Sequence, residues 1–196
     1  QMKATGEVMS VGRSFEESLL KAIRSLEEGK NHIHLEKFDA AHMSVDRLLE
    51  YIREGTDDRI YAISQLMGMG VDPSLICNRT QIDMFFLDKI KKIVDFEREL
   101  ERAPHDPATL REAKRMGFSD SYIAELWNTT EDEVYEWRVR ENIFPVYKMI
   151  DTCASEFDSY VPYFYSTYAE ENESVVTDRR KVIILGSGPI RIGQGV

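Results

Sequence analysis

Six residues near the end of the chain are of the types that bind phosphate groups. They form a glycine-rich turn directly after an apolar, β-branched run at residues 182–185, and they are Gly186, Gly188, Pro189, Arg191, Gly193 and Gln194. Glycines let the backbone approach a phosphate closely, and an arginine can pair with an anion. A tight turn from a strand into a helix, without any ligand, fits the same residues equally well.

Two histidines and a glutamate at alternate positions offer the residue types of a metal site. His32, His34 and Glu36 would lie on one face if this stretch formed a strand. No second pair of ligands follows, because His42 and His105 have no ligand neighbours at a useful spacing. Histidines exposed to solvent in a loop are the better interpretation, and we predict no metal site.

The rest of the sequence marks no catalytic centre. Carboxylates are plentiful, but no two are marked as a catalytic pair, and we find neither a serine or cysteine nucleophile motif nor a Walker-type phosphate loop. We therefore predict no catalytic residue in this chain.

The composition is that of a soluble globular protein. Of 196 residues, 42% are hydrophobic, and the formal net charge of −10 opposes binding to nucleic acids and anionic membranes. No apolar run approaches the roughly 20 residues that span a bilayer, and the N-terminus lacks the pattern of a signal peptide. Cys77 and Cys153 are expected to be reduced packing residues of a cytoplasmic protein.

The elements that would position these residues are mainly helical. Ser14 and Glu17 have the spacing of a capping box, and an apolar stripe follows at Phe15, Leu19, Ile23 and Leu26. From about 45 to 142 every strong signal is helical. Helix starts are predicted at Asp72 with Pro73, Asp106 with Pro107, Thr80 with Asp83, and Thr130 with Glu133, and helix ends at Gly70 and Gly117.

A long helix is expected to begin near Gln81. Its inward side chains would be Phe86, Ile90, Ile93 or Val94, and Leu100. Its solvent-facing side chains would be Lys89, Lys91, Lys92, Glu97, Arg98, Glu99 and Arg102.

Two stretches, beginning near residues 66 and 114, resemble copies of one helix-turn-helix unit. The match pairs Gly70 with Gly117 and Thr80 with Thr130, with three extra residues before the second threonine. A helical regulatory or nucleic-acid-binding module is therefore an alternative function. The candidate recognition helix at 131–142 weakens it, because five acidic residues there oppose two arginines.

The character of the sequence changes after Asn142. Five of the nine tyrosines fall between residues 147 and 168, together with Pro162 and little helical periodicity. This composition predicts an extended connector that lies across other surfaces. The apolar run at 182–185 is typical of a buried parallel strand, which needs a neighbouring strand and a crossover helix. The sequence ends at Val196 before either, so we expect a piece of a larger protein.

Three stretches resemble the large subunit of carbamoyl phosphate synthetase. They are KATGEVMSVGRSFEESLLKAIRSLE at 3–27, NIFPVYKMIDTCASEF at 142–157 with PYFYSTYAEENE at 162–173, and KVIILGSGPIRIGQG at 181–195. Together with FFLDKI at 85–90 they cover nearly the whole chain in the order of the family.

The resemblance implies a mainly α fold, in which a helical oligomerisation domain with helix-hairpin units is flanked by short extended pieces of neighbouring α/β domains. Residues 1–29 would be the C-terminal edge of the carboxyphosphate half, an ATP-grasp unit. Residues 30–150 would be the oligomerisation domain, 151–178 the tyrosine-rich connector, and 179–196 the first strand and glycine-rich loop of the carbamoyl phosphate half.

The resemblance also implies a function for the parent protein. It would be an ATP-dependent ligase that forms carbamoyl phosphate from bicarbonate and ammonia or glutamine nitrogen, for arginine and pyrimidine biosynthesis. Its cofactors would be ATP, Mg²⁺ or Mn²⁺ and K⁺, none of them held by this chain. Its partner would be a glutamine amidotransferase small subunit. This chain would be an inactive linking and oligomerisation module that self-associates through its helices.

In that setting the six glycine-loop residues would lie near the substrate path of the second half and would not bind ATP. The chain departs from the family at Ile190, where many members carry asparagine, so a polar contact there is not expected. Two apolar groups are candidates for an oligomer contact, namely Met84, Phe85 and Leu87, and Trp127, Tyr135 and Trp137. Burial in the core is the competing and more frequent fate of such residues.

Overall fold

The computed structural model describes residues 8–26, 28–151, 153, 156–157 and 163–185. Within these ranges it contains eight α-helices, one 3₁₀ helix and one two-stranded sheet, which confirms the predicted mainly α fold. The elements are α1 (Phe15–Ser25), η1 (Glu36–Phe38), α2 (Val45–Tyr51), α3 (Arg59–Gly68), α4 (Pro73–Thr80), α5 (Met84–Arg102), α6 (Pro107–Arg115), α7 (Asp120–Trp127), α8 (Glu131–Arg140), β1 (Val146–Met149) and β2 (Phe164–Thr167).

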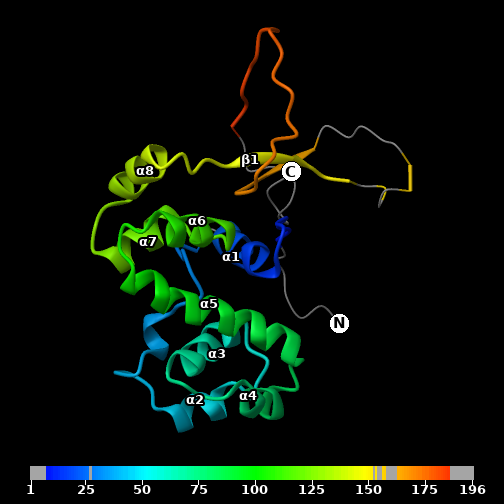
Figure 1. Cartoon of the computed structure of the whole chain (residues 1–196). Helices are drawn as coiled ribbons and strands as arrows, with labels where there is room; N and C mark the ends of the chain where they lie inside the picture. The colour runs from blue at the N-terminus through cyan, green and yellow to red at the C-terminus, as the bar shows by residue number, and fades with distance from the viewer. Residues whose placement is uncertain (1–7, 27, 152, 154–155, 158–162, 186–196) are drawn as a thin grey trace.

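The long helix α5 runs through the middle of the helical body, with α2, α3 and α4 on one side of it and α1, α6 and α7 on the other (Figure 1). Its buried side chains are Leu87, Ile90, Ile93, Val94 and Leu100. They belong to one core cluster together with Leu20 of α1 and Ile123 of α7. Burial of large apolar side chains on both sides of α5 is therefore the main force that holds the helices together.

Local capping chemistry explains most helix boundaries. The predicted caps at Asp72, Asp106 and Thr130 are confirmed, and Thr130 forms a complete capping box with Glu133. The cap of α1 is only half a box. Ser14 Oγ accepts a hydrogen bond from Glu17 N at 3.1 Å, but the Glu17 carboxylate accepts from Arg13 N, at 2.7 Å, and not from the cap residue itself.

The predicted start of the long helix is wrong by about one turn. Thr80 is the last residue of α4, and its hydroxyl donates to Ile76 O at 2.8 Å. Asp83 caps α5 instead, by accepting a hydrogen bond from Phe85 N at 2.8 Å. In the helix that results, Leu87 points into the core, whereas Phe86, predicted to point inward, is exposed.

The apolar stripe predicted for α1 also needs correction. Its buried residues are Leu20 and Ile23, together with the carboxylate-bearing Glu16 and Glu17, while Phe15 and Leu19 are half-buried. The buried face is therefore rotated from the predicted one, because Glu16 finds a cationic partner, Lys92, on α5, and Glu17 pairs with Lys21 within α1.

The two helix-turn-helix copies match with a constant offset of 47 positions and no inserted residues. Gly70 and Gly117 both have positive φ angles, +86° and +91°, directly after a helix. The eight-residue helices α4 and α7 follow, and each ends on a left-handed residue, Gln81 or Asn128. The predicted pairing of Thr80 with Thr130 is wrong, because Asp83 is the residue that occupies the position of Thr130.

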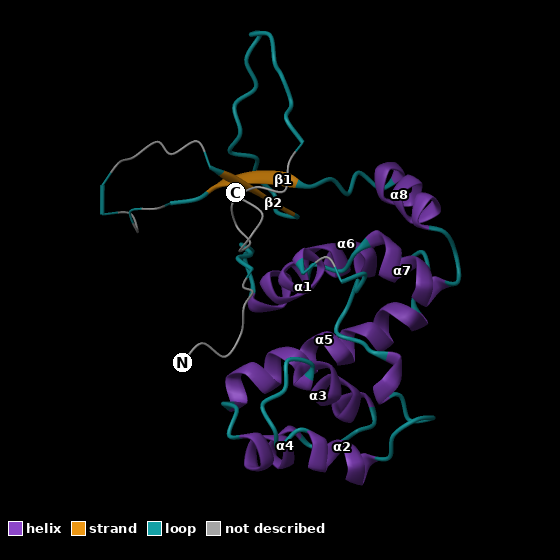
Figure 2. Ribbon diagram, turned by 180° about the vertical axis from the view of Figure 1, so that it is seen from behind, coloured by secondary structure: helices purple, strands orange, loops and turns teal. Residues whose placement is uncertain are grey.

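The strand pair lies beside the helical body (Figure 2). β1 and β2 are antiparallel, with Val146 opposite Thr167 and Met149 opposite Phe164. The apolar run at 182–185 forms no strand in the described part of the chain, and its side chains are 84–93% exposed. None of the helices in the described ranges combines the length and the apolar character that crossing a membrane requires.

Candidate functional site

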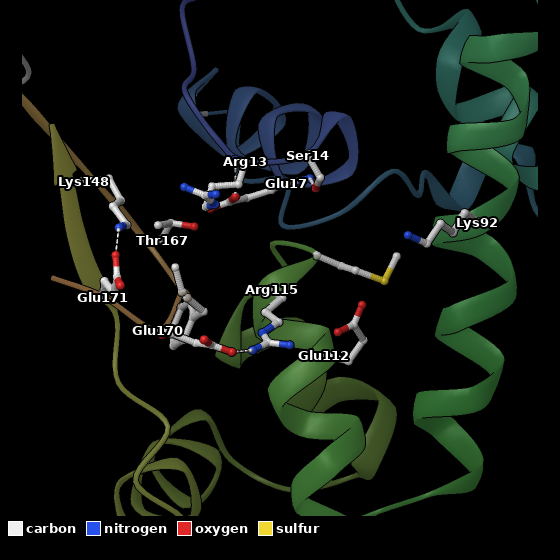
Figure 3. A pocket seen from close by; sticks show the side chains of 13 residues that line it. Arg13, Ser14, Glu17, Lys92, Glu112, Arg115, Lys148, Thr167, Glu170 and Glu171 are labelled. Atoms are coloured by element: carbon white, nitrogen blue, oxygen red, sulfur yellow. Dashed lines mark hydrogen bonds and ion pairs between the residues drawn. The ribbon is translucent and has the colours of Figure 1, made fainter. Parts of the chain in front are cut away.

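A cleft of about 400 Å³ lies between the start of α1, the end of α6 and the strand pair (Figure 3). Its lining mixes both signs of charge: the labelled side chains are Arg13, Ser14, Glu17, Lys92, Glu112, Arg115, Lys148, Thr167, Glu170 and Glu171.

Several charged groups of this cleft pair with one another or with a residue just outside it. Arg115 lies 3.7 Å from Glu170, and Lys148 Nζ lies 3.7 Å from Glu171 and 3.0 Å from Glu173, which is outside the lining. The buried Glu17 carboxylate is 2.7 Å from Lys21 Nζ, and the same ammonium donates to Ser166 O of β2, at 2.5 Å. These contacts connect the strand pair to α1 and α6. The cleft is accordingly a polar joint, and its geometry does not single out a reacting group.

A second ionic cluster fixes α6, α7 and α8 to one another. The Asp120 carboxylate is 2.8 Å from Lys114 Nζ and 2.9 Å from Arg138 Nη2, and all three side chains are largely buried. Burial acts to raise the pKa of Asp120, but Lys114 and Arg138 outweigh it and hold that pKa below its usual range. Both cations also lie near the ring of Tyr168, just after β2, at 5.2 and 5.7 Å.

His32 is buried, so the prediction of solvent-exposed loop histidines is wrong for this residue. Its ring stacks on Tyr122, and its Nε2 lies 3.5 Å from Glu97, which also accepts a hydrogen bond from the Tyr122 hydroxyl. Burial lowers the pKa of His32, and Glu97 only partly opposes this. Glu97 was expected to face solvent, and this buried histidine explains why it does not.

The other proposed metal ligands do not converge with His32. His34 is half-exposed and lies 3.3 Å from Asp39, and Glu36 begins the 3₁₀ helix where a strand was considered. No group of three histidine, cysteine or carboxylate side chains in the described residues is arranged to hold a metal ion.

The structure separates the six candidate contact residues into core and surface. Leu87 and Trp127 are in the core, and Trp127 Nε1 donates to Leu100 O at 2.8 Å. Trp137 is half-buried, with its ring 5.2 Å from that of His105. Met84, Phe85 and Tyr135 are exposed.

The six residues of the glycine-rich loop lie outside the described residues.

Two further phenylalanines join Phe85 on the surface. The ring of Phe15 lies 5.5 Å from that of Phe86 and 6.2 Å from that of Phe85, and the latter two are 5.3 Å apart. We call Phe15, Met84, Phe85 and Phe86 the aromatic face. The sequence prediction missed Phe86 and Phe15 because it assigned both side chains to buried faces.

The recognition helix of the alternative function corresponds to α8. Its first turn holds three exposed acidic residues, Glu131, Asp132 and Glu133. Phosphate groups would be repelled there. This arrangement gives no support to nucleic-acid binding by α8.

Comparison with known protein families gives a match over most of the chain. The family model described as carbamoyl-phosphate synthetase large chain, oligomerisation domain, matches residues 7–142. The matched range includes every helix from α1 to α8, and therefore both helix-turn-helix units and the aromatic face.

Proposed function

The chain belongs to the family of carbamoyl-phosphate synthetase large chain oligomerisation domains, and from this we propose that it is the self-associating, linking module of such a large chain. The observation that carries the proposal is the family match across the whole helical body. The aromatic face supports it, because exposed apolar groups that lie together are typical of interaction surfaces.

The chemistry of the parent would take place in neighbouring domains. There, an ATP-dependent ligase would form carbamoyl phosphate from bicarbonate and ammonia or glutamine nitrogen, in the cytoplasm, for arginine and pyrimidine biosynthesis. ATP, Mg²⁺ or Mn²⁺ and K⁺ would be held by the ATP-grasp halves, and the glutamine amidotransferase small subunit would deliver nitrogen. In the cleft of Figure 3, Arg115 pairs with Glu170 and Lys148 with Glu171, which suits a joint between domains.

The domain boundaries belong to this proposal. Residues 1–29 would be the edge of the first half, 30–150 the oligomerisation domain, 151–178 the connector, and 179–196 the start of the second half. The exposure of residues 182–185 supports the last assignment. A β-branched run that is apolar on both faces is typical of a parallel strand with sheet neighbours on each side, and a second ATP-grasp half would supply that sheet.

Activity of the purified chain tests the non-catalytic part of the proposal. We expect no bicarbonate-dependent release of phosphate from ATP in the presence of Mg²⁺. Release that scales with chain concentration, and that survives a second purification step, would overturn it. Glu50→Lys, purified by the same procedure, is the control protein. Glu50 is exposed on α2, so reversing its charge should leave the fold intact.

A further inference from the structure

The two helix-turn-helix units differ in the first turn of their second helix. Residues 84–86 open α5 and residues 131–133 open α8, 47 positions later, and both follow a side-chain cap, Asp83 or Thr130. The second unit carries Glu131, Asp132 and Glu133 there, while the first carries Met84, Phe85 and Phe86. Acidic residues suit a first helical turn because they interact favourably with the helix dipole. The helix-turn-helix geometry therefore does not require the apolar residues of the first unit.

Those apolar residues remain accessible although they pack on one another. Phe85 is 55% and Phe86 44% exposed, even with the ring of Phe15 against them. Contact with Phe15 thus covers only part of the aromatic face. The remaining surface would gain free energy from burial against another apolar surface.

The charges around the aromatic face are mixed in sign, whereas the chain as a whole is strongly acidic. The net charge of −10 makes two copies repel one another on average. Next to the aromatic face, however, the cap and first turns of α5 carry three lysines and two exposed aspartates. These residues are Lys89, Lys91, Lys92, Asp83 and Asp88. Lys89 and Lys92 already lie 3.5 and 3.3 Å from the buried Glu16.

A surface that carries both signs of charge can be complementary to itself. When it meets its own copy, lysines of one chain can lie near Asp83 and Asp88 of the other. At the equivalent position of the second unit, three acidic residues on each copy would face one another. We infer that the aromatic face, with its rim of mixed charge, is the surface through which two copies of this chain associate. This inference rests on the proposed self-association and names the contact that produces it.

The test compares two exposed aromatic positions. Phe85→Glu places a charge in the aromatic face, and Tyr135→Glu places the same charge at a residue of similar exposure, 53%, on α8. Sedimentation velocity across a hundredfold range of concentration gives the dimer dissociation constant of each. We expect Phe85→Glu to raise that constant about tenfold or more, as for a central contact residue, and Tyr135→Glu to leave it within about twofold.

Thermal unfolding shows whether Phe85→Glu weakens only the contact between two copies or unfolds the chain itself. Both variants should unfold cooperatively with circular dichroism spectra like that of the unmodified chain, because both side chains are half-exposed. If Phe85→Glu unfolds, Phe85→Gln replaces it, with a smaller increase expected. Equal dissociation constants for Phe85→Glu and the unmodified chain would overturn this contact while leaving self-association intact. A monomeric unmodified chain at every concentration would overturn the contact and the proposed self-association together.

Discussion

The imidazole of His32 lies parallel to the phenol ring of Tyr122, with centroids 3.9 Å apart and an interplanar angle of 10°. This stacking joins the segment after α1 to α7, and Glu97 of α5 lies 3.5 Å from the same imidazole. Phe118 adds a second aromatic contact at 4.9 Å. Elements far apart in the sequence therefore meet around one neutral histidine in the interior.

Stability should fall between pH 7 and pH 5 because of His32. Burial lowers its pKa from 6.5; Glu97 opposes this only in part, and Arg24 and His34 act in the same direction as burial. Below about pH 6.5 the unfolded chain then binds a proton that the folded chain resists. The contribution of the neutral His32 side chain to the free energy of unfolding is fully present above the unfolded pKa of about 6.5. It decreases as the pH falls from there to the lower pKa of the folded chain. Urea titrations at both pH values should show a smaller decrease for His32→Phe than for the unmodified chain.

His34→Phe is the matched control for that experiment, because His34 lies two residues away and is half-exposed. It should keep the pH dependence of the unmodified chain. The same decrease in His32→Phe and in the unmodified chain would show that His32 does not cause it.

Gly117→Ala should destabilise the protein more than Gly70→Ala. Both glycines have positive φ angles, which cost an alanine about 1–2 kcal/mol. A Cβ at Gly70 would meet open space, whereas a Cβ at Gly117 would lie 2.9 Å from Glu17 Cα and displace the backbone of α1. Chemical denaturation of both variants measures the difference. Equal losses would contradict the close approach of α1 to the turn before α7.

Asp120→Ala should cost about 3–5 kcal/mol of unfolding free energy, because it leaves the buried cations Lys114 and Arg138 without their carboxylate. The exposed pair of Lys91 and Asp95 is the comparison, and Asp95→Ala should cost no more than about 1 kcal/mol. A loss below about 1 kcal/mol for Asp120→Ala would show that the cluster does not join α6, α7 and α8.

Trp127→Ala should cost about 3–5 kcal/mol, since the indole is buried and its N–H bonds to Leu100 O. Tyr135→Ala removes an exposed ring and should stay within about 1 kcal/mol. Thermal melting of the two variants distinguishes core from surface among the candidate contact residues. Similar melting temperatures would contradict the core position of Trp127.

Sequence reasoning predicted those features of the fold that depend on adjacent residues. Asp72 with Pro73, and Thr130 with Glu133, cap helices through contacts within a few positions, so their residue types were sufficient. It failed at Thr80, because Asp83 supplies the same kind of cap three residues later.

Burial of polar residues was the larger failure. Glu16 and His32 are buried and Glu97 is half-buried, because their partners come from other elements, such as Lys92 for Glu16 and Tyr122 for Glu97. No local spacing indicates such pairs. The family resemblance, in contrast, depended on long motifs, and the family match confirms it.

Self-association of this helical module can be tested by the absolute mass of the chain in solution. Multi-angle light scattering of the purified, unmodified chain, over a hundredfold range of concentration, measures that mass without a reference shape. We predict a dimer or larger species at high concentration that dissociates on dilution. A mass of 22.7 kDa, that of one chain, at every concentration would contradict self-association.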